Sequence, residues 1–218
     1  MPPTNTPPPP PPETFTITAP PNSDIWASPP STHRFNAPLA HVSRAPLQAF
    51  TRAGLTLSLP PQESLVQYDQ GGILLAITRP GEQQPSDAKR WLKTGIEMCD
   101  GEPWLTVVGC DRWSDLSMVP LAWGGSAEEG KGRRPTARVE VERVKDALWV
   151  YWVTEGKDGE KGRRVPIREL SWFFSHEKIA GEAWEVSVSA YAVRPLKNEK
   201  DEDETLDVEF RRFEVEWS

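Results

Sequence analysis

The stretches VQYDQGGILLAIT (Val66–Thr78) and KRWLKTGIEMCDGEPWLTVVGCDRWSD (Lys89–Asp115) carry the strongest structural signals of this chain. Asp100-Gly101 is a strong signal for a two-residue type I′ hairpin turn, and the segments on either side are rich in β-branched and aromatic residues. The turn fixes the register, because Cys99 must then face Glu102 and the other pairs follow in order. The sequence therefore predicts an antiparallel sheet built around this hairpin.

The two faces of the predicted sheet differ, because successive side chains of a strand point to opposite sides. We expect the apolar residues of the strand over 66–78 to pair with those of the strand over 90–99. The numbers of two paired residues then add up to an odd value of about 169. One face then collects mostly apolar side chains from three strands: Ile73, Leu75, Ile77, Leu92, Thr94, Ile96, Met98, Leu105 and Val107. The other collects polar and aromatic side chains beside two glycines: Gln70, Gly72, Trp91, Lys93, Gly95, Glu97, Trp104 and Thr106. Glycines at such positions are expected to leave room for something to approach the sheet.

The rest of the chain repeats this short, alternating pattern. Segments rich in β-branched and aromatic residues are separated by turn signals, and none keeps a helical period. The predicted strands are residues 35–42, 54–60, 66–78, 90–99, 103–110, 116–121, 137–144, 147–155, 163–174, 185–194 and 206–217. This pattern is typical of an all-β antiparallel sandwich or barrel.

The N-terminus differs in composition from the rest of the 218-residue chain, since twelve of its first thirty residues are proline. Proline fixes φ and lacks an N–H, so such a run favours extended polyproline II and cannot join a strand ladder. We predict a disordered tail over residues 1–21 and one domain over residues 22–218. The tail is either a ligand for an SH3, WW or profilin-type module or an unselected flexible segment, and the second interpretation is favoured.

Charge and cysteine content limit the classes of partner. The net charge of −7 and the pI of about 5.1 argue against nucleic acid or an anionic membrane, because both attract cationic surfaces. No stretch approaches the ~18 apolar residues of a membrane span, and no secretory signal is visible, so a cytoplasmic protein is expected. It is also expected to be a monomer. In the predicted register Cys99 and Cys110 lie roughly 25 Å apart, too far for a disulfide. Two cysteines are also too few for a four-thiolate zinc site, and neither metal nor other cofactor is expected.

Four motifs in this order carry a family resemblance: YDQGG (68–72), WLKTGIE (91–97), CDGEPWLTVV (99–108) and WSDLS (113–117). Together they resemble the fungal and bacterial domain-of-unknown-function family that includes the yeast regulator-of-enolase protein. The resemblance extends over about Phe35–Trp217, and the last motif reads WSDLS where the family has SDWS. It implies a concanavalin A-like lectin/glucanase fold, a jelly-roll sandwich of two antiparallel sheets.

The same resemblance implies a site on the concave sheet face, where proteins of this fold hold carbohydrate. The expected ligand-binding residues are Gln70, Trp91, Lys93, Glu97, Trp104, Trp113 and Ser114. Structural roles are expected for Tyr68, Asp69, Gly72 and Gly95, and Asp69 is expected to cap the start of its strand by accepting from turn amides. Lys93 and Glu97 either bind a polar ligand beside a stacking tryptophan or form a charge set on a solvated sheet.

Three functions remain open at this point. The leading hypothesis is a non-catalytic binding module for a carbohydrate or other small polar ligand. The second, implied by the resemblance, is a regulatory adaptor whose partner is a metabolic enzyme. The third is a glycan-active hydrolase, which requires two carboxylates about 5 Å apart in a retaining enzyme. No strand carries the E-x-D-x-E pattern that would supply them, and Glu140 and Glu142 are flanked by basic residues on a strand predicted to be half-exposed.

Overall fold

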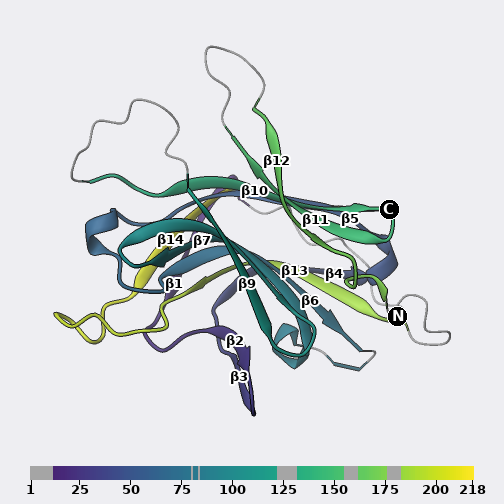
Figure 1. The fold of residues 1–218 in the computed structure, drawn as a ribbon, viewed down its shortest axis with the longest axis horizontal. Coiled ribbons are helices and arrows are strands. Elements are labelled where there is room, and N and C mark those ends of the chain that lie inside the picture. Colours follow the sequence, from purple (N-terminus) through teal and green to yellow (C-terminus); the bar gives the residue numbers. More distant parts are fainter. Residues whose placement is uncertain (1–11, 80, 83, 122–131, 155–161, 176–182) are drawn as a thin grey trace, which may run out of the picture.

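The computed structural model describes residues 12–79, 81–82, 84–121, 132–154, 162–175 and 183–218. Within these ranges the chain forms two six-stranded antiparallel sheets, one small two-stranded sheet and three short 3₁₀ helices. Figure 1 shows the strands of the two large sheets as two layers, with the small β2–β3 sheet projecting from one side. The predicted all-β sandwich of jelly-roll type is confirmed. Within the same ranges no helix is long and apolar enough to cross a membrane.

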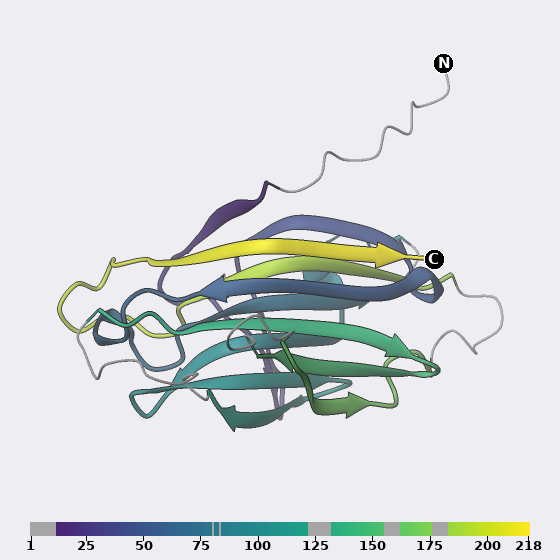
Figure 2. The same cartoon turned by 90° about the horizontal axis from the view of Figure 1, so that it is seen from above.

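The first sheet has the strand order β1-β14-β5-β10-β11-β12. Its strands are β1 (Thr14–Ala19), β5 (Phe50–Ser58), β10 (Thr136–Val144), β11 (Ala147–Val153), β12 (Arg164–Leu170) and β14 (Leu206–Trp217). The long yellow strand β14 crosses the width of the molecule in Figure 2 and pairs with β1 on one side and β5 on the other.

The second sheet has the order β4-β13-β6-β7-β8-β9 and contains the hairpin predicted at Asp100-Gly101. Its strands are β4 (Leu39–Pro46), β6 (Gln70–Thr78), β7 (Arg90–Cys99), β8 (Glu102–Cys110), β9 (Ser114–Pro120) and β13 (Glu185–Val193). Short 3₁₀ helices η1 (Leu47–Ala49), η2 (Gln62–Ser64) and η3 (Pro85–Asp87) lie in the connections before β5, β6 and β7.

The main core fills the space between the two sheets. It buries the alternating apolar side chains predicted for one face of β6, β7 and β8, among them Leu75, Leu92 and Val107. From the first sheet it receives residues such as Leu55 and Val139, which are fully buried. The predicted inward face of the second sheet is therefore confirmed, and its polar face points away from the sandwich.

The predicted hairpin register is confirmed. Cys99 faces Glu102 across the turn, and Asp100 and Gly101 both have positive φ, as a type I′ turn requires. Cys99 and Cys110 are free and lie at opposite ends of this hairpin.

The pairing of β6 with β7 has the predicted parity but is displaced by two residues. Gln70 faces Glu97, so paired residue numbers sum to 167 rather than 169. A shift of two residues leaves every side chain on its predicted face, because the side-chain period of a strand is two.

Strand β1 corrects the predicted domain boundary. The proline content predicts a tail over residues 1–21, but Thr14–Ala19 forms an edge strand that pairs with β14. The segment TFTITA alternates, and it buries Ile17 and Ala19 against the core. This period of two outweighs the neighbouring prolines, so the sandwich begins at Thr14 and not at residue 22. Residues 1–11 of the predicted tail lie outside the described residues.

Gly72 and Gly95 face each other on neighbouring strands, and the neighbouring backbone fills the space beside them. A Cβ on Gly72 would lie 1.9 Å from the carbonyl oxygen of Thr94, and one on Gly95 would lie 1.9 Å from that of Gly71. The prediction that these glycines leave room for a ligand is therefore wrong. They allow β6 and β7 to approach each other closely.

Strands β2 (Ile25–Ser28) and β3 (Thr32–Phe35) form a hairpin that the sequence did not predict. The hairpin packs on the outward face of the second sheet, where Ile25 and Ala27 join a second buried cluster with Trp91 and Leu74. It therefore covers part of the polar and aromatic face described above. The part left uncovered becomes the candidate site.

Replacing Gly95 with Ala is expected to destabilise the sandwich by at least about 3 kcal/mol, because the new methyl group meets backbone atoms that cannot rotate away. Urea unfolding followed by tryptophan fluorescence measures the loss. Gly54→Ala is the control, since the nearest atom to its new Cβ is a side-chain carbon, Glu140 Cγ, at 3.2 Å. We expect that control to lose only about 1 kcal/mol. Equal losses in the two variants would contradict the close approach of β6 and β7.

Candidate functional site

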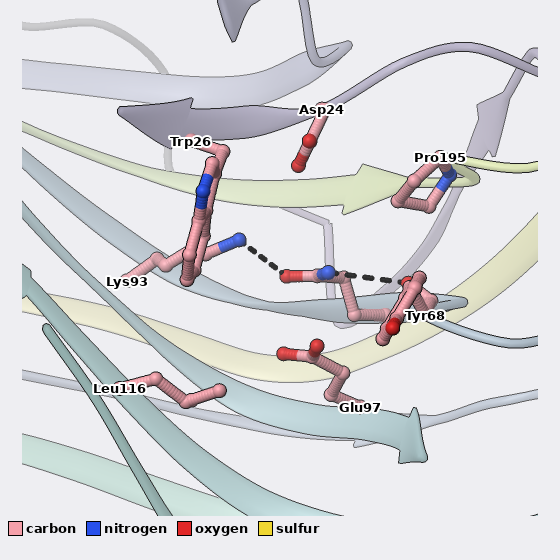
Figure 3. A pocket seen from close by; sticks show the side chains of 8 residues that line it. Asp24, Trp26, Tyr68, Lys93, Glu97, Leu116 and Pro195 are labelled. Carbon is pink, nitrogen blue, oxygen red and sulfur yellow. Dashed lines mark hydrogen bonds between the residues drawn. The ribbon is translucent and has the colours of Figure 1, made fainter. Parts of the chain in front are cut away.

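A pocket of about 400 Å³ opens on the outward face of the second sheet, beside the β2–β3 hairpin. Figure 3 shows its side chains converging from β6, β7 and β9 on one side and from the β2 segment on the other. The lining residues are Asp24, Trp26, Tyr68, Gln70, Lys93, Glu97, Leu116 and Pro195. This volume lies within the range of ordinary small-molecule sites, roughly 300–1,000 Å³.

Lys93 is the central polar group of the pocket. Its side chain rises from the middle of β7 and is 2% exposed, although a lysine is rarely buried without a partner. The ammonium Nζ donates to Gln70 Oε1 at 2.7 Å, and it lies 5.8 Å from the centre of the Trp26 ring. Gln70 is oriented in turn by donating from its Nε2 to the Tyr68 carbonyl at 3.1 Å.

Two carboxylates flank Lys93 without touching it. Figure 3 shows Glu97 of β7 and Asp24 on opposite sides of the Lys93–Gln70 hydrogen bond. Among the described residues, no ion pair joins Lys93 to a carboxylate. Burial lowers the pKa of Lys93, and the charges of Glu97 and Asp24 only partly offset this effect. Burial raises the pKa of Glu97, Lys93 opposes that change, and Asp24 adds to it.

The β2–β3 hairpin supplies one wall of the pocket and is held in place by polar contacts. The Ala27 amide donates to Ser114 Oγ at 2.9 Å, which fixes β2 to the start of β9. The Asp24 amide donates to Asn36 Oδ1 at 2.8 Å, and this contact closes the open end of the hairpin. These contacts place Trp26 over the Lys93 side chain.

A buried ion pair supports the opposite end of the pocket. The Arg194 guanidinium donates to both oxygens of Asp69, at 3.0 and 2.8 Å, and the two side chains are 2% and 0% exposed. Asp69 also accepts from the Val66 amide at 2.9 Å, as the predicted strand cap requires. The pair joins the residue before Gln70 to the residue before Pro195, so both pocket-lining positions are fixed by it.

The structure brings together three of the seven predicted ligand-binding residues. Gln70, Lys93 and Glu97 line the pocket. Tyr68, for which only a structural role was predicted, also lines it; this residue has a φ of +68° and a side chain that is 42% exposed.

The other four predicted ligand-binding residues do not line the pocket. Trp91 is fully buried beneath the β2–β3 hairpin, and its ring meets Phe35 edge to face with centroids 6.5 Å apart. Trp104 donates its indole N–H to the Cys99 carbonyl at 3.2 Å, and Trp113 packs beside Arg112. Ser114 anchors β2 through the bond described above. The hairpin explains the positions of Trp91 and Ser114, because it occupies the sheet face above Trp91 and bonds to Ser114.

Sequence reasoning missed four residues of the pocket: Asp24, Trp26, Leu116 and Pro195. It also did not single out Tyr191 of β13, which pairs with Gly72 and is fully buried; its hydroxyl has no hydrogen-bond partner among the residues that the structure describes. Burial raises the pKa of Tyr191 well above its ordinary value, and the charges of Glu97 and Asp24 act in the same direction. The alternating segment Ile25–Ser28 was the one signal for the hairpin, and it is only four residues long.

Comparison with protein families matches residues 4–217 to the family described as "Protein of unknown function (DUF1349)". The chain belongs to this family. An uncharacterized protein of Emericella nidulans is similar in sequence. The two are 38% identical over 182 residues, which cover 83% of this chain and 77% of that protein. The family description supplies no activity.

Solved structures of other proteins have a fold similar to that of this chain. A functionally unknown protein from Saccharomyces cerevisiae has a TM-score of 0.57 and 18% identity, covering 94% of this chain and 89% of that one. A mutant of the GH43 protein BlXynB from Bacillus licheniformis has a TM-score of 0.51 and 13% identity. That second match covers 94% of this chain but only 33% of the other. At these identities the likeness concerns the fold alone.

The buried charges of the pocket are expected to reduce the stability of the protein. Replacing both as Lys93→Met/Glu97→Gln should leave the free energy of unfolding unchanged or raise it by up to about 4 kcal/mol, because two desolvated charges are removed together. Lys93→Met alone should be less stable than this double variant, because it leaves the Glu97 carboxylate buried without its nearby cation. Urea unfolding at neutral pH compares the three proteins. If the free energy of unfolding of the double variant is several kcal/mol below that of the wild type, Lys93 and Glu97 stabilise the fold and the expectation is contradicted.

Proposed function

We propose that this protein is a binding module for a small, neutral, polyhydroxylated ligand, of which a carbohydrate is the leading example. The single observation that carries the proposal is the buried Lys93 amine at the base of an open pocket. A lysine ammonium has three N–H donors, and among the described residues it has one hydrogen-bond acceptor, Gln70 Oε1. A ligand oxygen would satisfy a remaining donor and offset part of the desolvation of the charge.

The charges of the pocket favour a neutral ligand over an anionic one. Lys93 contributes one positive group, whereas Asp24 and Glu97 contribute two carboxyl groups. A phosphate or carboxylate brings only acceptor oxygens to these two carboxyl groups, while a hydroxyl group accepts from the amine and donates to a carboxyl oxygen. A polyol therefore matches this set of donors and acceptors.

Trp26 and Tyr68 add apolar surface at two sides of the pocket. Aromatic rings offer large, rigid contact area, and sugars present apolar C–H faces between their hydroxyl groups. Trp26 is therefore proposed as the stacking residue, in place of the tryptophans predicted from the sequence. The protein is further proposed to act in the cytoplasm as a monomer.

A glycan-active hydrolase is the second candidate, because Asp24 and Glu97 both line the pocket. Lys93 and Gln70 lie between these carboxylates in Figure 3, in the space where a glycosidic oxygen would have to bind. Binding is for this reason preferred over hydrolysis. Release of reducing ends from oligosaccharides, abolished in Glu97→Gln, would reverse the preference.

A regulatory adaptor for a metabolic enzyme has less support. The exposed large apolar side chains of the described residues are Val42, Tyr68, Val144 and Leu196, which come from four separate segments. An extended apolar docking patch of a few hundred Å² would be expected for such a partner.

Thermal unfolding of the full chain against a panel of neutral mono- and oligosaccharides, alditols and sugar phosphates tests the proposal. A neutral ligand at about 100 times its dissociation constant should stabilise the protein by about 2.7 kcal/mol, and sugar phosphates should stabilise it less. Trp26→Ala and Lys93→Met/Glu97→Gln should abolish the shift.

Trp104→Phe is the matched control, because Trp104 lies on the same sheet face but outside the pocket. It should keep the full ligand-induced shift. Absence of a shift with every compound, or a shift that survives in the Lys93→Met/Glu97→Gln variant, would reject the proposed site.

A further inference from the structure

The amine of Lys93 has an environment that suits covalent chemistry as well as hydrogen bonding. Its Nζ lines a pocket large enough for a small molecule, yet the side chain is 2% exposed. Among the described residues, its polar contact is to a neutral amide oxygen at 2.7 Å, and no carboxylate forms an ion pair with it. A lysine held in this way gives up its proton more readily than a surface lysine, and the neutral amine is a nucleophile.

A carboxyl group stands close enough to influence that amine. Glu97 lies four residues along the same face of β7, and its charge acts on Lys93 while the charge of Lys93 acts on it. Burial raises the pKa of Glu97, so this carboxyl retains a proton more readily than an exposed glutamate. An amine that gives up its proton readily and a carboxyl group that holds one readily, on the same face of β7, are the pair of groups that carbonyl addition uses.

We infer that the pocket captures a ligand with a free carbonyl group, such as an open-chain sugar or a small hydroxyaldehyde, as an imine on Lys93. This inference rests on the proposed function, because it concerns the same pocket and deepens its ligand class. It adds that the carbonyl carbon reaches Lys93 Nζ, with the hydroxyl groups of the ligand toward Asp24 and Glu97.

The step balances without an added reactant. The lone pair of Lys93 Nζ forms the new C–N bond while the π electrons of the C=O bond move to oxygen. Glu97 gives that oxygen a proton and takes one from the nitrogen, which leaves a neutral carbinolamine. Glu97 then protonates the hydroxyl group, the C–O bond breaks as water leaves, the nitrogen lone pair forms the C=N bond, and the second nitrogen proton returns to Glu97. The sum is amine plus carbonyl giving imine plus water, with no change in oxidation state. Hydrolysis reverses the reaction and releases the ligand.

Reductive trapping of the full chain with D-glyceraldehyde and cyanoborohydride tests the inference. The reductant converts an imine into a stable secondary amine, and peptide mass spectrometry locates it. Lys93 should be labelled at least tenfold faster than the exposed Lys145 and Lys200, which serve as internal controls in the same sample. Glu97→Gln should slow labelling of Lys93 about tenfold or more, as expected for loss of a general acid. Labelling of the two control lysines should not change.

Lys93→Arg keeps the positive charge but lacks the amine nucleophile, and it should abolish the pocket label. If this variant fails to fold, competition replaces it: a neutral alditol without a carbonyl group should slow the labelling of Lys93 in the wild-type protein. Labelling of Lys93 at the rate of Lys145 and Lys200 would overturn the inference. If alditols still stabilise the protein in that case, the proposed binding function stands, whereas failure of both measurements rejects both proposals.

Discussion

Alternation of side chains along β6 and β7 fixes both the core of the sandwich and the polar groups of the pocket. Because the side-chain period is two, alternate residues face opposite sides of the sheet. Leu75 and Leu92 point into the sandwich. Gln70, Lys93 and Glu97 point outward. The close approach of the two strands at their facing glycines holds these rows together. A polar group is thereby placed on a rigid strand, where its position is better defined than on a loop.

The sequence predicted the sandwich well, because hairpin chemistry and alternation are local properties. It placed Gln70, Lys93 and Glu97 on one face and paired Cys99 with Glu102, as the structure has them. It failed where a distant segment docks. Neither the burial of Trp91 nor the role of Trp26 follows from any local pattern, since both depend on the β2–β3 hairpin folding over the sheet.

The hairpin also explains why a lysine can be buried here. On a bare sheet, Lys93 would extend into water and keep its charge solvated. Under Trp26, and beside the second buried cluster, it loses that solvent and depends on Gln70 for its hydrogen bond. Natural sequences accept such unfavourable burial mainly at functional sites, where stability is given up for chemistry.

The pairing of β1 with β14 joins two described strands that lie almost two hundred residues apart in the sequence, such as Thr14 with Arg211. During synthesis the first sheet cannot be completed until β14 has left the ribosome. Strand β1 therefore has no partner while the residues between the two strands are being made. Contacts between such distant residues are slow to form, and an unpaired edge strand is exposed to other chains in the meantime. Pro12, two residues before β1, lacks an N–H and therefore cannot donate to a misplaced strand that pairs beyond the start of β1.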